Sequence, residues 1–78
     1  MALKVEIYSK ESCPFCVKAK ALAEREKLDF DYYMLNEDFT REELFEKFPT
    51  ARTFPQITVD GKSIGGYDDF KAYIDLQT

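Results

Sequence analysis

Apolar and charged residues alternate at the start of the chain, where Leu3, Val5 and Ile7 are separated by Lys4 and Glu6. A period of two is typical of a strand with one buried face, so this segment is predicted to be the first strand. Three more strands are predicted. An aromatic run predicts one at residues 30–35, and the alternation of Ile57 and Val59 predicts the next. The Asp60-Gly61 hairpin turn then predicts a fourth strand at residues 62–65.

Helical signals occupy the intervening segments. Ser12 is predicted to cap the first helix, because Pro14 suits a first turn and loses no hydrogen bond there. We expect this helix to reach about Lys27. Its buried stripe consists of Cys16, Ala19 and Ala23, with Leu22 on the flank.

Thr40 and Glu43 match a capping box at the start of a second, short helix. Phe39 could pack on Leu44 as the accompanying hydrophobic staple. Leu44, Phe45 and Phe48 are predicted to face inward, and Pro49 to end the helix. A third helix is predicted from the i, i+3, i+4 spacing of Phe70, Tyr73 and Ile74.

The order of these elements is βαβαββα. A helical connection predicts that the first two strands are parallel with a right-handed crossover, and the short turn makes the last two antiparallel. The chain is therefore expected to form one α/β domain over residues 1–78, with a four-stranded mixed sheet flanked by three helices.

Composition narrows the possible functions. Hydrophobic residues make up 45% of the chain, which is enough to build a core. The net charge is −4 and no basic cluster stands out, which argues against nucleic acid as a partner. Histidine is absent, and no apolar run reaches the roughly 20 residues that span a bilayer. The first residues do not resemble a signal peptide, so the expected compartment is the reducing cytoplasm.

The two cysteines, Cys13 and Cys16, form a single Cys-x-x-Cys pair. Such a pair can be half of a zinc site, a short structural disulfide, or two inert buried thiols. A zinc site needs four ligands, and this chain alone offers neither more cysteines nor histidine. A structural disulfide closing so short a loop stabilises little and tends to be reduced in the cytosol. Redox chemistry is the favoured interpretation, and no metal site is expected.

The position of the pair supports redox chemistry. Cys13 lies where a helix begins, so free N–H groups and the helix dipole favour its thiolate, which is the reactive species. Lys10 adds a nearby positive charge. Cys16 lies one turn along the same face and should be the more buried sulfur. We therefore predict that Cys13 attacks and that Cys16 resolves the intermediate.

Three segments resemble the glutaredoxin family across nearly the whole chain. Residues 8–16 resemble the active-site segment, with Phe15 where the family usually has Tyr. The segment Thr53-Phe54-Pro55 resembles the family's Thr-Val-Pro motif, which contains a cis-proline. The segment Gly65-Gly66-Tyr67-Asp68-Asp69 resembles the glycine pair and helix start that seat glutathione. The resemblance implies a thioredoxin-like (glutaredoxin) fold.

The resemblance also implies contacts for glutathione. A cis bond before Pro55 would expose the backbone of Phe54 to pair with a cysteinyl peptide. The helix start would bind the γ-glutamyl carboxylate, and Asp68 or Asp69 the amine. A basic side chain would flank the glycine carboxylate, with Lys10 preferred over Arg52, and Arg52 over Arg41. The expected glutathione-binding residues are Lys10, Phe15, Arg52, Thr53, Phe54, Pro55, Gly66, Tyr67 and Asp68.

The predicted activity is glutathione-dependent reduction of protein disulfides and glutathione mixed disulfides. Glutathione would be a co-substrate, and no permanent cofactor is expected. Cluster-carrying relatives usually have Cys-Gly-Phe-Ser, so no iron–sulfur cluster is expected. Partners would be disulfide-containing or glutathionylated proteins, with ribonucleotide reductase suggested by family analogy, and the chain is expected to be monomeric and to bind no membrane. The rival hypotheses are a redoxin recharged by thioredoxin reductase, a module that holds zinc or a cluster at a dimer interface, and a pure interaction domain.

Overall fold

The computed structural model describes residues 4–49 and 54–77, and it contains the predicted βαβαββα order. The strands are β1 (Lys4–Ser9), β2 (Asp29–Met34), β3 (Gln56–Val59) and β4 (Lys62–Gly65). The helices are α1 (Pro14–Arg25), α2 (Arg41–Lys47) and α3 (Tyr67–Gln77). Among these residues no helix is both long enough and apolar enough to cross a bilayer.

The strands form one mixed sheet in the order β2-β1-β3-β4. β1 and β2 are parallel, with Lys4 opposite Asp29, whereas β1 and β3 are antiparallel, with Ile7 opposite Ile57. β3 and β4 form the predicted antiparallel hairpin. Its turn residues Asp60 and Gly61 both have positive φ, which the favoured two-residue hairpin turn requires.

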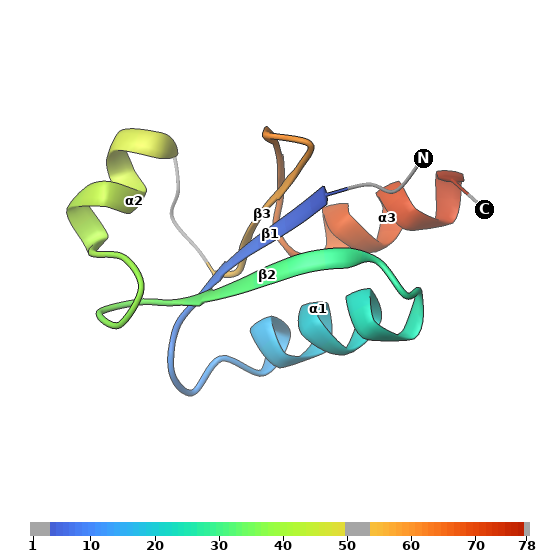
Figure 1. Ribbon diagram of the computed structural model, residues 1–78, viewed down its shortest axis with the longest axis horizontal. Coiled ribbons are helices and arrows are strands. Elements are labelled where there is room, and N and C mark those ends of the chain that lie inside the picture. The colour runs from blue at the N-terminus through green and yellow to red at the C-terminus, as the bar shows by residue number, and fades with distance from the viewer. Residues whose placement is uncertain (1–3, 50–53, 78) are drawn as a thin grey trace.

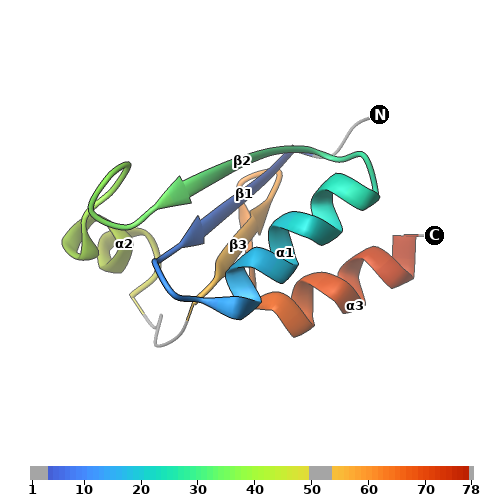
Figure 2. The same ribbon diagram turned by 90° about the horizontal axis from the view of Figure 1, so that it is seen from below.

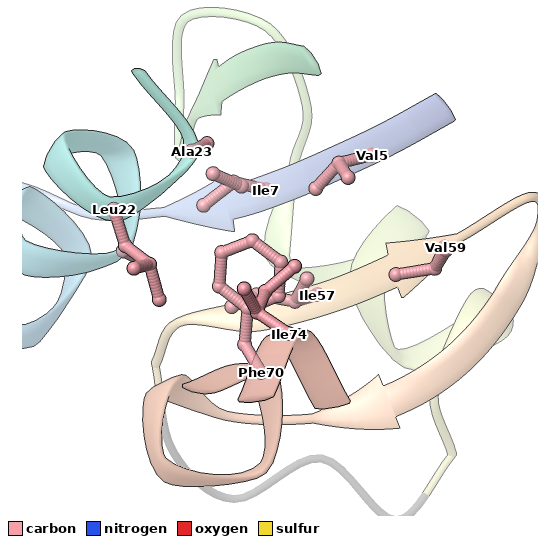
Figure 3. Close-up of a cluster of buried hydrophobic side chains, with 9 residues drawn as sticks. Val5, Ile7, Leu22, Ala23, Ile57, Val59, Phe70 and Ile74 are labelled. Carbon is pink, nitrogen blue, oxygen red and sulfur yellow. The ribbon is translucent and has the colours of Figure 1, made fainter. Parts of the chain in front are cut away.

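The helices α1 and α3 lie side by side over one face of the sheet (Figure 2). The main core fills the space between them and the strands (Figure 3). Because side chains alternate along a strand, Val5 and Ile7 of β1 both point into this core. The main core comprises Val5, Ile7, Ala19, Leu22, Ala23, Ile57, Val59, Phe70 and Ile74.

A second, smaller apolar cluster holds α2, which lies beyond the carboxyl ends of β1 and β2 (Figure 1). It consists of Tyr8, Phe39, Leu44 and Phe48, and the ring centroid of Tyr8 lies 5.3 Å from each of the two phenylalanine rings. The predicted capping box starts α2: Glu43 N–H donates to Thr40 Oγ1 at 3.1 Å, and Thr40 N–H donates to Glu43 Oε1 at 2.9 Å.

Several predicted boundaries and positions were wrong. β1 extends to Ser9, beyond the alternation that ends at Ile7, and the Ser9 hydroxyl donates to the Tyr33 carbonyl at 2.6 Å. α1 ends at Arg25, before Lys27. The buried face of α2 carries Leu44, and Phe48, four residues on, lies on the same face. Phe45, one residue after Leu44, points away from this face and is exposed. β2 begins and ends one residue earlier than predicted.

Candidate functional site: a dithiol at the start of a helix

The dithiol lies where the chain leaves β1 and enters α1. Ser12 adopts a left-handed backbone conformation, with φ of 56°, and turns the chain toward the helix. Cys13 is the N-cap residue, and Pro14 occupies the first turn. The prediction that Ser12 caps the helix was therefore wrong by one residue, because Pro14 opens the helix and leaves the cap to the residue before it.

The two sulfurs form a disulfide, with the Cα atoms of Cys13 and Cys16 5.2 Å apart. Cys16 is fully buried, whereas 8% of Cys13 remains exposed. This difference confirms the prediction that Cys16 is the more buried of the two. Only Cys13 therefore offers any surface to an incoming sulfur.

The helix start directs backbone N–H groups at Cys13. Cys16 N–H donates to Cys13 Sγ at 3.1 Å, and Cys16 and Val17 N–H both reach the Cys13 carbonyl, at 3.1 Å and 3.2 Å. The first turn of α1 contains no acidic residue. The N–H group and the positive end of the helix dipole both lie at Cys13, and such groups favour a thiolate over a thiol.

A shallow depression of about 470 Å³ opens beside Cys13. Its lining residues are Lys10, Glu11, Ser12, Cys13, Pro14, Val17, Tyr32 and Met34. A larger cavity of about 520 Å³ lies between α2 and the sheet, but its lining contains neither cysteine. The chemistry therefore places the candidate site at the smaller depression.

The peptide bond between Phe54 and Pro55 is cis, as predicted. Pro55 is fully buried. A Cβ atom added to Gly66 would lie 3.4 Å from the Pro55 carbonyl oxygen, so the turn before α3 passes closely against this segment. Glycine permits that approach. Arg52 and Thr53, which the sequence also implicates, lie outside the described residues.

Other predicted residues meet in pairs around the dithiol. The Lys10 ammonium lies 5.7 Å from the centroid of the Phe54 ring. The rings of Phe15 and Tyr67 lie 6.0 Å apart, which joins the dithiol segment to the start of α3. Asp68 is exposed at that helix start. Arg41, the least favoured cation, is exposed at the start of α2 and is not among the residues that line the depression.

An aspartate, Asp69, holds the start of α3. The Gly66 carbonyl accepts from Phe70 N–H at 2.9 Å, and Gly66 N–H approaches Asp69 Oδ2 at 3.4 Å. Asp69 therefore reaches back to the residue before the helix. This leaves Asp68 exposed beside Tyr67.

The sequence interpretation missed two lysines of α1. The Lys18 ammonium lies 4.9 Å from the centroid of the Phe15 ring, and the Lys20 ammonium 5.0 Å from that of Tyr32. The i, i+3 spacing of Phe15 and Lys18 could have indicated the first contact. The second joins α1 to β2 and has no local signal in the sequence.

Comparisons with known proteins agree on one family. The glutaredoxin family model matches residues 5–64 of the chain. Glutaredoxin 1 of Escherichia coli strain K12 is 40% identical over 79 aligned residues, covering 92% of this chain and 93% of the relative. A glutaredoxin of Haemophilus influenzae is 41% identical, covering 94% of this chain and 92% of the relative.

The chain belongs to the glutaredoxin family. Solved structures of glutaredoxins support this assignment. The crystal structure of Francisella tularensis glutaredoxin 1 complexed with cacodylate matches with a TM-score of 0.82 at 31% identity, covering 97% of this chain and 96% of the other. The solution structure of reduced E. coli glutaredoxin gives a TM-score of 0.79 at 37% identity, covering 96% and 99%.

Membership assigns this glutaredoxin a thioredoxin-like fold and thiol–disulfide oxidoreductase activity, with Cys13 and Cys16 as the pair spaced like the family's active-site cysteines. The predictions of family, fold and redox-active pair are thereby confirmed. The general activity needs only two sulfurs that can alternate between dithiol and disulfide, and the structure shows the disulfide state.

Proposed function

We propose that this glutaredoxin is a glutathione-dependent reductase of protein disulfides and glutathione mixed disulfides, with Cys13 as its nucleophile. The observation that carries the proposal is the unequal environment of the two sulfurs. Cys13 is partly exposed and accepts an N–H from the helix start, whereas Cys16 is fully buried behind it. An attacking thiol needs access and thiolate character, and a resolving thiol needs only proximity.

In the dithiol route, the Cys13 thiolate attacks one sulfur of a target disulfide and releases the other as a thiolate. The Cys16 thiolate then attacks Cys13 Sγ, and the target leaves with its second sulfur reduced. The target has gained two electrons, and the Cys13–Cys16 disulfide has formed. Two glutathione molecules reopen this bond and leave as glutathione disulfide.

In the monothiol route, Cys13 attacks the glutathione sulfur of a glutathionylated protein. The protein thiol is released, and the glutathionyl group remains on Cys13. A second glutathione then displaces it and forms glutathione disulfide. Cys16 takes no part in this route, which is the basis for separating the two activities by mutation.

The proposed glutathione contacts are those that the family resemblance implies. Lys10 pairs with a carboxylate, and the Phe54 backbone beside cis-Pro55 pairs with the cysteinyl backbone. Gly66, Tyr67 and Asp68 receive the γ-glutamyl end, and Phe15 flanks the sulfur. The pairing of Lys10 with Phe54 and of Phe15 with Tyr67 supports one continuous site, because it draws three separate segments together. Arg52 and Thr53 complete the proposed set.

A coupled assay with glutathione, glutathione reductase and NADPH tests the proposal. Wild type is expected to turn over both a protein disulfide and a glutathionylated peptide. Cys13→Ser is expected to lose both activities, whereas Cys16→Ser keeps deglutathionylation and loses reduction of the protein disulfide. Equal loss of both activities in Cys16→Ser would contradict the division of roles. Turnover with thioredoxin reductase but not with glutathione would favour the rival redoxin.

We further propose that the protein works as a monomer in the cytoplasm, where glutathione is abundant. Its targets would be disulfide-containing or glutathionylated proteins, with ribonucleotide reductase proposed by family analogy alone. Size-exclusion chromatography with light scattering tests the oligomeric state. Trapping with Cys16→Ser, in which the mixed disulfide is no longer resolved by Cys16, would identify the protein targets.

A further inference from the structure

The exposed surface of α1 next to the dithiol is apolar and positively charged. Phe15 is 50% exposed and Val17 is 63% exposed, so two large apolar side chains of the first turns of α1 are in contact with solvent. From Pro14 to Ala23, the only charged residues are Lys18 and Lys20. The whole chain, in contrast, has a net charge of −4. Phe15 and Lys18 lie on the flank of α1 toward Tyr67 of α3, whereas Lys20 lies on the flank toward Tyr32 of β2. Val17 shares the second flank, because residues three apart on a helix are neighbours. We call these two flanks together the α1 surface.

The two lysines are positioned by aromatic rings and not by acidic neighbours. The Lys18 ammonium rests over Phe15, and the Lys20 ammonium over Tyr32, a residue that also lines the depression beside Cys13. Within residues 4–49 and 54–77, neither lysine forms an ion pair. Their charges therefore remain available to a partner, while the rings limit the positions that the ammonium groups sample.

The α1 surface lies outside the contacts proposed for most of glutathione. Those contacts run from Lys10 and Phe54 to the start of α3, whereas Lys18 and Lys20 lie farther along α1. With a rise of 1.5 Å per residue, they lie about 8 Å and about 10 Å along the helix axis from Cys13. An extended peptide advances about 3.3 Å per residue, so these distances correspond to about two and three residues from a reacting cysteine.

We infer that the α1 surface binds acidic segments of disulfide partners, with carboxylates two and three residues from the cysteine that Cys13 attacks. Phe15 and Val17 contact the apolar part of the segment, and Lys18 and Lys20 pair with its carboxylates. The inference deepens the proposed function, since it rests on attack by Cys13. It does not depend on glutathione as the reductant.

Single-turnover exchange without glutathione tests this inference. The pre-reduced protein reacts with peptides whose one cysteine is disulfide-bonded to 2-thiopyridone, an uncharged leaving group with its own absorbance. Three peptides differ only at the positions two and three residues from the cysteine, which carry Asp, Asn or Lys. Each rate is divided by the rate of the same peptide with dithiothreitol, because nearby charges also change the reactivity of the peptide sulfur.

At low ionic strength we expect the Asp peptide to react about fivefold faster than the Asn peptide, since each exposed charge pair contributes a modest factor. The Lys peptide should be the slowest. In about 1 M salt, where the screening length falls to about 3 Å, the three rates should converge.

The double variant Lys18→Glu/Lys20→Glu should reverse the order of the peptides. Its matched control is Lys27→Glu/Lys62→Glu, which changes the net charge by the same amount. Lys27 precedes β2 and Lys62 opens β4, so both lie near the amino end of β1, away from the dithiol. The control should keep the preference for Asp.

Equal normalised rates for the three peptides in wild type would overturn the inference while leaving the disulfide chemistry intact. Equal loss of preference in both double variants would overturn it as well, because net charge and not the α1 surface would then be responsible. No release from any peptide would contradict attack by Cys13 and remove the basis of the inference.

Discussion

Phe70 is the largest fully buried side chain among the residues that the structure describes, and its removal should cost a large share of the folding free energy. Its ring points from α3 into the main core beside Ile57 and Ile74 (Figure 3). Replacement of a buried Phe by Ala typically costs about 3–5 kcal/mol, from lost burial and the cavity left behind. Domains have about 0.05–0.15 kcal/mol of stability per residue, or about 4–12 kcal/mol for this chain.

Urea unfolding followed by circular dichroism measures this loss. With a slope of about 1 kcal/mol per molar urea for a chain of this size, Phe70→Ala should lower the midpoint by about 3–5 M and leave the slope unchanged. Leu76→Ala, on the same helix but 84% exposed, is the control and should change stability by no more than about 0.5 kcal/mol. A loss below about 1 kcal/mol in Phe70→Ala would refute the assignment of Phe70 to the core.

The same substitution should affect the site. Phe70 N–H donates to the Gly66 carbonyl at 2.9 Å, and the Phe70 ring anchors the first turn of α3. That turn carries the residues proposed to bind the γ-glutamyl end of glutathione. Phe70→Ala is therefore expected to raise the KM for glutathione at temperatures where the variant remains folded.

Two further predictions concern α2 and Tyr33, which packs against the smaller apolar cluster. Thr40→Ala removes the acceptor of the Glu43 N–H and should lower the free energy of unfolding by about 1 kcal/mol, or the thermal midpoint by about 4–8 °C. Thr40→Ser keeps the hydroxyl and should retain most of this stability. Equal stability of the Ala and Ser variants would contradict the capping role. Burial, with the nearby charges of Asp31 and Glu6, raises the pKa of Tyr33 to about 12. Because this pKa exceeds that of an unfolded tyrosine, the contribution of Tyr33 to stability is complete below about pH 10 and is lost toward pH 12. Tyr33→Phe should flatten stability in that window, and a drop as steep as in wild type would exclude Tyr33 as the cause.

Local patterns predicted most of the fold because each element has its own signal. The Thr40 capping box and the Asp60-Gly61 turn are formed as predicted, since their chemistry is contained within a few neighbouring residues. The errors fell where two local preferences compete. Ser12 is a good cap by composition, but proline at the first helical position gives the cap to Cys13.

At the candidate site, some features could be predicted from local sequence and others could not. The relative burial of Cys13 and Cys16 followed from the helical stripe, because Cys16 shares a face with Ala19 and Ala23. The cis bond before Pro55 followed from the family resemblance, since the local sequence alone favours a proline that opens a strand. The contact of Lys20 with Tyr32 depends on how α1 packs on β2, and no short-range pattern contains that information.

The two apolar clusters give the molecule two levels of stability. The main core between the sheet and the helices α1 and α3 contains no residue of α2. Both cysteines lie at the start of α1, beside this core. α2 depends on four buried side chains and one capping box. Amide hydrogens of α2 should therefore exchange with solvent through local openings long before those of β1. Substitutions in α2 are therefore expected to disturb the sulfur chemistry less than substitutions in the main core.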